Sequence, residues 1–224
     1  MRAGKIRSFG TSKMPPSRLV EARALAERRG HSLFRTEEVP YSMLNRAVEY
    51  DLLPTCQRLG TGVLAFSALS GGWLSGRHRD SAAAGGLAVS PLARGMDAAA
   101  PGNATKLEAA RSLGALAEQA GLSAVQLATA FVLRHPGVTS AVIGPRTIEH
   151  LEGYLAADGV HLSDDVLDAV DAIVPPRGHS GPPHSAGSGR SPTSREPRRR
   201  FDVGTGQASS MSKQTMRGPL MRKT

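Results

Sequence analysis

The chain has little of what stabilises secreted or membrane-embedded proteins. It holds one cysteine, Cys56, among 224 residues, so no disulfide framework can form within it. No apolar stretch reaches the roughly 18 residues of a membrane-spanning helix, and the first ten residues, MRAGKIRSFG, contain no apolar run of a signal peptide. These absences predict a cytoplasmic protein that does not enter a membrane.

Aromatic residues and metal-binding patterns are also scarce. Only 4% of the residues are aromatic, whereas 40% are hydrophobic, which is enough for one domain with a sizeable core. No cluster of His, Cys and Asp in the sequence has the spacing of metal ligands. The composition therefore predicts one globular domain and no metal site.

The net charge of +9 is concentrated at the C-terminal end of the chain. Residues 177–224 hold ten Lys or Arg and two acids, or +8, which leaves eighteen bases and seventeen acids, or +1, for residues 1–176. In the same 48 residues, Gly, Ser, Pro and Arg account for 28. Such a composition cannot bury enough apolar surface to order itself. We expect a folded body over 1–176 and a disordered basic tail over 177–224.

The tail has more than one interpretation. Its run of Arg198, Arg199 and Arg200 would suit contact with nucleic-acid phosphates. Only Phe201 offers an aromatic face for base stacking, so a solvated tail is favoured over nucleic-acid association. Out-of-frame or read-through sequence would have a similar composition.

Within the body, strand-like and helix-like patterns alternate four times. Short apolar stretches predict strands at 5–10, 34–38, 63–67 and 138–143. Apolar residues at helical spacing, with Pro, Ser or Gly at the ends, predict helices at 15–29, 45–59, 107–116, 123–132, 148–155 and 163–173. A long Ala, Gly and Pro loop is expected at 77–103. The alternation predicts an α/β fold with a parallel sheet flanked by helices.

An arginine stands at the last junction between strand and helix, in the stretch AVIGPRTIEHLEGYL at 141–155. The amide groups at a helix N-terminus and the helix dipole favour an anion there. The residues alone leave open whether Arg146 contacts such an anion or is solvated.

Four stretches, in this order, resemble landmarks of the aldo-keto reductases: GKIRSFGTSK, YSMLNR, GVLAFSALSGGWLSGR and AVIGPRTIEHLEGYL. The resemblance covers roughly residues 3–176. It implies a (β/α)8 TIM barrel that reduces carbonyls with NADPH. The match begins at what would be the fifth strand, so it implies a partial barrel of about four β-α units, the second half. The family's catalytic aspartate, tyrosine, lysine and histidine belong to the other half, and no catalytic residue is assigned.

The resemblance implies a partial NADP site. Arg146 would bind the 2′-phosphate of NADP, with Gly144 in the same loop and Thr147 adding a hydroxyl. His150 and Tyr154 take the places where the family often has glutamine and asparagine beside the adenine end.

A second loop would hold the pyrophosphate. Residues 67–72 follow the third predicted strand, where Ser67, Leu69 and Gly71 are the candidate contacts; the glycines of this loop allow backbone amides to approach phosphate oxygens.

At the nicotinamide end, the sequence departs from the family. Ser12 keeps its place, but Lys13 replaces an asparagine and Glu38 a glutamine that bond the carboxamide. Tyr41 would stack on the ring. Lys13 and Glu38 are expected to pair as a salt bridge.

The resemblance favours one function: a truncated reductase relative that is inactive alone. The alternatives are a non-catalytic NADP-binding or regulatory protein, and a nucleic-acid-associated protein acting through its tail. The predicted edge strands, around Ile6 and Val142, would lack partners, so self-association through open sheet edges is also expected.

Overall fold

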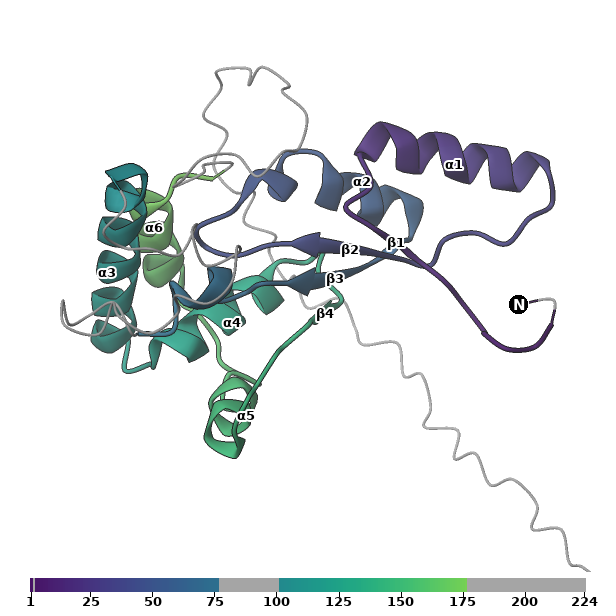
Figure 1. The fold of residues 1–224 in the computed structure, drawn as a ribbon. Coiled ribbons are helices and arrows are strands. Elements are labelled where there is room, and N and C mark those ends of the chain that lie inside the picture. The colour runs from purple at the N-terminus through teal and green to yellow at the C-terminus, as the bar shows by residue number, and fades with distance from the viewer. Residues whose placement is uncertain (2, 77–100, 177–224) are drawn as a thin grey trace, which may run out of the picture. The chain divides into compact units, whose positions relative to one another are not determined.

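Four parallel strands form the centre of the structure. The computed structural model describes residues 1, 3–76 and 101–176. One sheet has the order β1-β2-β3-β4 (Figure 1), and all three of its strand pairs are parallel. The strands are β1 (Thr11–Ser12), β2 (Thr36–Pro40), β3 (Gly62–Phe66) and β4 (Ser140–Ala141). Each crossover contains a helix, because a parallel neighbour can be reached only by a long return. The predicted parallel α/β fold is confirmed.

In the part of the chain that the structure describes, six α-helices and three short 3-10 turns lie between the strands or follow the last one. The α-helices are α1 (Pro16–Arg28), α2 (Leu52–Leu59), α3 (Ala104–Gln119), α4 (Ala124–Arg134), α5 (Ile148–Leu155) and α6 (Asp164–Ile173). The 3-10 turns are η1 (Ala47–Glu49), η2 (Ser70–Gly72) and η4 (Pro101–Asn103). Helix α2 packs against β3, and α4 packs against β4 and α5.

Cap residues fix three of the helix starts. Ser123 and Gln126 form a reciprocal capping box at α4, in which each side chain accepts from the backbone N–H of the other. Thr147 and Ser163 cap α5 and α6 through their side-chain oxygens. These helices begin where the sequence predicts, because each predicted start is marked by a hydroxyl residue.

Several predicted elements are wrong in extent. The strand predicted at 138–143 forms only as the two-residue β4, Ser140–Ala141. Residues 5–10 form no strand, and β1 begins only at Thr11. This segment lies at the edge of the sheet, beside β2. Arg35 N donates to Phe9 O at 2.9 Å, and the Phe9 ring packs edge-on against Phe34. The predicted helix at 45–59 is divided into η1 and α2, since Pro54 lacks the N–H that a continuous helix would need at that point.

The two faces of the sheet differ in burial. Val39, Val63 and Ala65 are completely buried and belong to the core that the helices cover. Side chains alternate along a strand, so Leu64 and Phe66 project to the opposite face, where both are only half-buried. Neither belongs to that core or packs against it. Among the described residues, helices thus cover the sheet mainly on one face.

A buried ionic cluster joins the last helix to the core. The guanidinium of Arg46, 0% exposed, lies 3.0 Å from Glu49 and 2.7 Å from Asp171 of α6. It also donates to the Val174 carbonyl at 2.6 Å and lies over the Phe131 ring at 5.2 Å. Burial alone would lower the pKa of Arg46, but the two carboxylates raise it above its ordinary value. The cluster therefore keeps Arg46 charged inside the protein.

Two predictions concern residues outside the described ranges. The tail at 177–224 and most of the loop predicted at 77–103 fall there. Within the described ranges, no single helix is both long and apolar enough to cross a membrane; α3 and α4 meet that test of length and composition only when taken together, across a 94° bend.

Candidate functional site

The loops after the four strands share one edge of the sheet. In a parallel sheet the carboxyl ends of all strands point the same way, and ligands of α/β proteins bind outside these ends. The segments that follow the strands begin at Lys13, Tyr41, Ser67 and Val142. Every candidate contact predicted from the sequence lies in one of these segments or in the strand before it.

Backbone strain gathers at this edge. Three non-glycine residues in the described part of the chain have positive φ: Lys13 at 54°, Ser67 at 59° and Ser70 at 50°. Lys13 follows β1, and the two serines follow β3. Such conformations are costly and gather at binding and catalytic sites. No local pattern predicts this strain, because Lys and Ser are ordinary loop residues.

The loop after β3 folds back on itself. Ser70 N donates to Ser67 O at 2.7 Å, and Gly72 N donates to Leu69 O at 2.9 Å. Gly71 has φ 71°, a conformation that favours glycine. Ser67 and Gly71 are exposed, whereas Leu69 packs against the core and anchors the loop. The loop thus presents small side chains and backbone, as a phosphate contact requires.

Arg146 stands at the start of α5, after β4. Its side chain is exposed, and it has no ion pair or hydrogen bond to any described residue. Gly144, two residues earlier, is also exposed. An unengaged guanidinium beside a helix N-terminus can bind a phosphate through two parallel hydrogen bonds.

Thr147 has a structural role at the same helix start. Its Oγ1 accepts from the backbone N–H of His150 at 3.2 Å. Hydrogen bonding from Thr147 also holds the pKa of the exposed Glu149 carboxyl below its ordinary value. The His150 side chain is exposed.

Ser12 and Glu38 lie side by side. They are direct partners in the β1–β2 ladder, and Glu38 is in turn the partner of Leu64 in β3. Lys13 N donates to the Glu38 carbonyl at 2.9 Å. The salt bridge predicted between the Lys13 and Glu38 side chains does not form, because the strained turn joins these residues through their backbones.

Tyr41 lies in the core. Its ring is 0% exposed and packs against Phe131 and His135, and its hydroxyl donates to Glu49 at 2.7 Å. This placement gives no support to stacking on a nicotinamide. Phe66, at the end of β3, is the half-exposed aromatic residue nearest the Ser67 loop in the chain.

Sequence reasoning also missed Glu37. This carboxylate is fully buried, accepts from Met14 N at 2.7 Å and bonds the Thr11 hydroxyl. It therefore fixes the turn in which Lys13 is strained. Side chains two residues apart on a strand point to the same face of the sheet. Because Val39 is a core residue, the sequence spacing places Glu37 on the core face as well.

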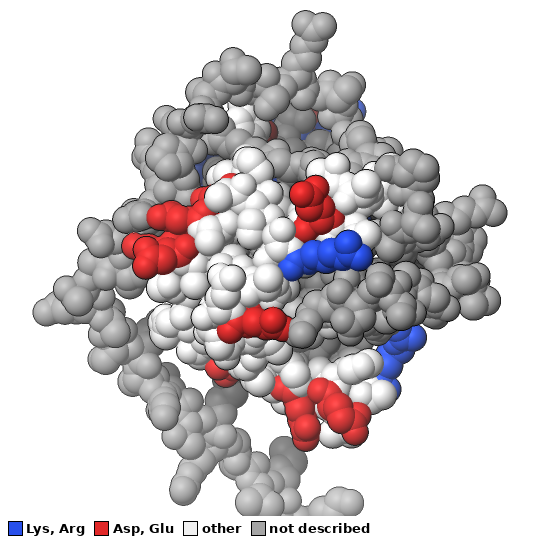
Figure 2. Space-filling view, turned by 90° about the vertical axis from the view of Figure 1, so that its left-hand side faces the viewer, with Lys and Arg blue, Asp and Glu red and all other residues white. Residues whose placement is uncertain are grey.

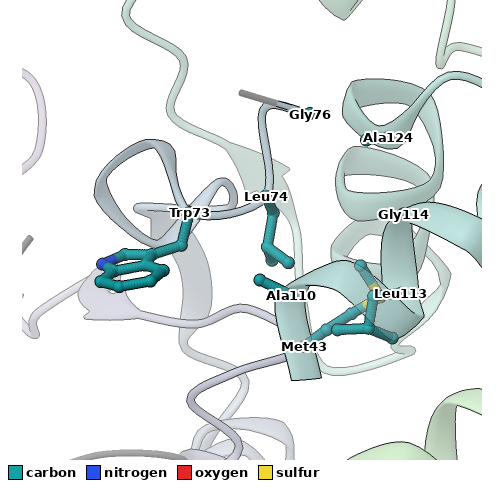
Figure 3. A pocket seen from close by; sticks show the side chains of 8 residues that line it. All are labelled: Met43, Trp73, Leu74, Gly76, Ala110, Leu113, Gly114 and Ala124. Atoms are coloured by element: carbon teal, nitrogen blue, oxygen red, sulfur yellow. The ribbon is translucent and has the colours of Figure 1, made fainter. Parts of the chain in front are cut away.

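A small apolar pocket lies beside the Ser67 loop (Figure 3). Its lining residues are Met43, Trp73, Leu74, Gly76, Ala110, Leu113, Gly114 and Ala124. The volume open to the centre of a water molecule in this pocket is about 10 Å³. The pocket therefore has room for about one water molecule and not for a nucleotide. Lys106 Nζ lies 4.8 Å from the centre of the Trp73 ring, and burial lowers the pKa of this lysine.

The surface on the side of α3 and α6 is not basic. Figure 2 shows acidic side chains more prominently than basic ones among the described residues of this face. Asp164, Asp165 and Asp168 of α6 are exposed there. In the described ranges, no group of three His, Cys, Asp or Glu could hold a metal ion.

These features define a parallel α/β protein with a candidate anion site at the carboxyl edge of its sheet. Comparison with known proteins gives the family. The aldo/keto reductase family model matches residues 1–175. The chain belongs to the aldo/keto reductase family.

Known relatives include bacterial and fungal proteins. The chain is 33% identical over 182 residues to the uncharacterized oxidoreductase YrpG of Bacillus subtilis, covering 81% of this chain and 53% of that protein. It is 32% identical to protein tas of Escherichia coli, covering 77% and 49%. It is 28% identical to a putative voltage-gated potassium channel subunit beta of Schizosaccharomyces pombe, covering 76% and 51%. The chain spans about half the length of these relatives.

Proposed function

We propose that the chain binds NADP(H) along the carboxyl edge of its sheet and does not reduce carbonyls by itself. The observation that carries this proposal is Arg146, an exposed guanidinium without a described partner at the N-terminus of α5. Family membership supplies the ligand class, because the aldo-keto reductases use nicotinamide cofactors. The residues fit the phosphate part of such a ligand.

Arg146 would favour NADP over NAD, since only NADP carries a 2′-phosphate for a guanidinium to clasp. The Ser67–Gly72 loop would receive the pyrophosphate through backbone amides. His150, in the first turn of α5, and Tyr154, one turn further on, would border the adenine end. Gly144 leaves space for the ligand beside Arg146, and Thr147 contributes by fixing the helix start.

The nicotinamide end fits less well. Glu38 and Lys13 stand where the family has amide side chains, and a carboxylate cannot donate to a carboxamide oxygen. Ser12 keeps one hydroxyl beside Glu38. The proposal therefore assigns the chain's affinity to the adenine and phosphate end, and we expect a loosely held ring.

Carbonyl reduction needs a proton donor at the developing alkoxide, and positioned acid-base catalysis is typically worth about 10²–10⁴-fold. The resemblance assigns that donor and its supporting residues to the other half of the family's barrel. We infer that these 224 residues on their own lack turnover.

The test is calorimetric titration of the purified chain with NADPH and with NADH. We expect NADPH to bind more tightly, and Arg146→Ala to remove that preference by weakening only NADPH. Arg134→Ala is the matched control, because this exposed arginine ends α4, ahead of β4, away from the carboxyl edge. Equal binding of both nucleotides, or equal loss in both variants, would refute the assignment.

A regulatory role is the second candidate. It is supported by the similarity to a protein named as a channel subunit, and it requires the same nucleotide site without turnover. Association with nucleic acid through residues 177–224 remains a third, and the acidic face in Figure 2 offers it no support from the body. Deleting 177–224 separates this third function from the other two.

A further inference from the structure

One face of the sheet lacks a cover among the described residues. Ser12, Glu38, Leu64 and Ser140 are successive ladder partners, so their side chains form one row across all four strands. Leu64 lies in this row and outside the core, and Ser12 and Ser140 are exposed. All-parallel sheets occur almost only where both faces are covered. The row therefore marks a surface that another element of structure should cover.

The two edges of the sheet are also unpaired within the described residues. There, β1 pairs only with β2, and β4 pairs only with β3. Each edge strand is two residues long, against five for the central strands. Val142, next to β4, is 43% exposed, and Ile6, ahead of β1, is 53% exposed. Open edges of this kind recruit further strands.

We propose that a second copy of this chain covers the open face and pairs both edges, with β4 of each copy beside β1 of the other. A rotation about an axis along the strands keeps all strands parallel, which a parallel edge requires. Two four-stranded sheets related in this way contain the eight strands of a closed α/β barrel. The same operation satisfies both edges at once, so assembly stops at the dimer.

The register across the new seam follows from barrel geometry. Following ladder partners once around an eight-stranded barrel shifts the register by about eight residues, hence by about four over each half. The row starts at Ser12 of one copy and ends at Ser140 of the same copy. The next ladder partner of Ser140, on β1 of the other copy, is shifted by about four residues from position 12, and is therefore residue 8 or residue 16. Pro16 already belongs to α1, so Ser8 is the partner.

Ser8 lies in the segment 5–10 that the sequence predicts as a strand and the single chain leaves outside the ladder. The dimer thus explains a strand pattern that the monomer does not use. This inference does not rest on nucleotide binding, and its test is made without nucleotide.

The first measurement is sedimentation velocity of the full chain over a range of concentrations. We expect a species of twice the 23.5 kDa chain mass. Leu64→Lys, which adds a charge to the open face without removing a core residue, should leave a folded monomer. Leu25→Lys is the matched control, because Leu25 is 38% exposed on the outer helix α1. Circular dichroism verifies that both variants fold.

The second measurement is cross-linking of the Ser8→Cys/Ser140→Cys double variant under mild oxidation. Within one copy, β1 and β4 are three strand spacings apart, roughly 14 Å, which no disulfide spans. A covalent dimer should form with both cysteines, and also when the two single variants are mixed, but not from either single variant alone. The native Cys56 is buried.

A monomer at all concentrations, an aggregate that grows without limit, or a dimer that survives Leu64→Lys would overturn the proposal. So would a monomer that associates only with a different β/α chain. Absence of the disulfide in a dimer would overturn the head-to-tail arrangement.

Discussion

Arg46 joins three separate parts of the core. It connects η1, through Glu49, to α6, through Asp171, and it lies against the Phe131 ring of α4. Replacing it would leave Glu49, whose side chain is 6% exposed, without its bidentate cation. The energetic cost arises less from the lost attraction than from the buried carboxylate that remains.

We predict that Arg46→Met lowers the free energy of unfolding by about 3–5 kcal/mol, since one partner of a buried pair is removed. Urea denaturation measures this. Arg18→Met is the control, because Arg18 pairs with Glu21 at 3.2 Å on the exposed surface of α1 and should change stability by less than about 1 kcal/mol. Similar losses in the two variants would contradict the role given to the Arg46 cluster.

The burial of the Cys56 thiol can be tested through the pH dependence of the protein's stability. Burial, and secondly the charge of Glu37, raises the pKa of this thiol from 9.0 to about 11. Above pH 9 the unfolded chain therefore loses the thiol proton before the folded chain does. The thiol's contribution to stability is complete below pH 9 and falls as the pH rises towards 11.

We predict that raising the pH from 8 to 10.5 lowers the free energy of unfolding of the native chain by roughly 2 kcal/mol more than that of Cys56→Ala. Comparing the two chains removes the effects of other groups that titrate in this range. Urea midpoints at several pH values measure the difference, and a difference independent of pH would refute the raised pKa.

At the scale of elements, α5 combines an attraction for anions with an opposing charge. Arg146 and the helix N-terminus favour a phosphate, whereas Glu149 in the first turn repels it. The acid stabilises the helix itself. Helix stability and nucleotide affinity are therefore opposed at this helix start.

We predict that Glu149→Gln tightens NADPH binding by less than about tenfold, and that the gain shrinks at high salt, because exposed charges are screened. Titration at low and high ionic strength tests this. Glu152→Gln is the control one turn further along α5, where the helix terminus has little effect. Weaker binding after Glu149→Gln would show that the carboxylate contacts the ligand favourably.

The elements that the sequence predicts well are those with local signals. Ser123, Thr147 and Ser163 mark helix starts through their own side chains, so α4, α5 and α6 follow from short stretches. The extent of β1 depends on which strands lie beside it, and no local pattern carries that information. The same limit explains why the strand predicted at residues 5–10 does not form in the single chain.

The candidate site divides in the same way. Arg146 stands out through its position after a strand and before a helix, and both are local features; its phosphate role is implied by the family resemblance and stays a prediction. The burial of Tyr41 and Glu37 depends on the side of β2 that the helices cover and on contacts to Phe131 and Thr11, far away in the sequence. The strain at Lys13 follows from those contacts, and so was invisible in the sequence.

At the scale of the whole molecule, the described residues form a parallel sheet with one face covered by helices and a proposed phosphate site at its carboxyl edge. Its relatives are about twice as long as the segment they share with it. In the function proposed here, nucleotide binding uses elements of this chain, whereas carbonyl reduction would need residues that the family resemblance assigns to the other half of the barrel.

The most direct test of this separation is to follow NADPH absorbance after mixing the purified chain with NADPH and a panel of reactive aldehydes, at a nucleotide concentration that titration shows to saturate the site. We expect bound NADPH and no NADPH consumption above the rate without protein, for the native chain and for Arg146→Ala alike. Saturable consumption of NADPH that Arg146→Ala lowers would contradict it, because these residues would then have assembled a proton donor of their own.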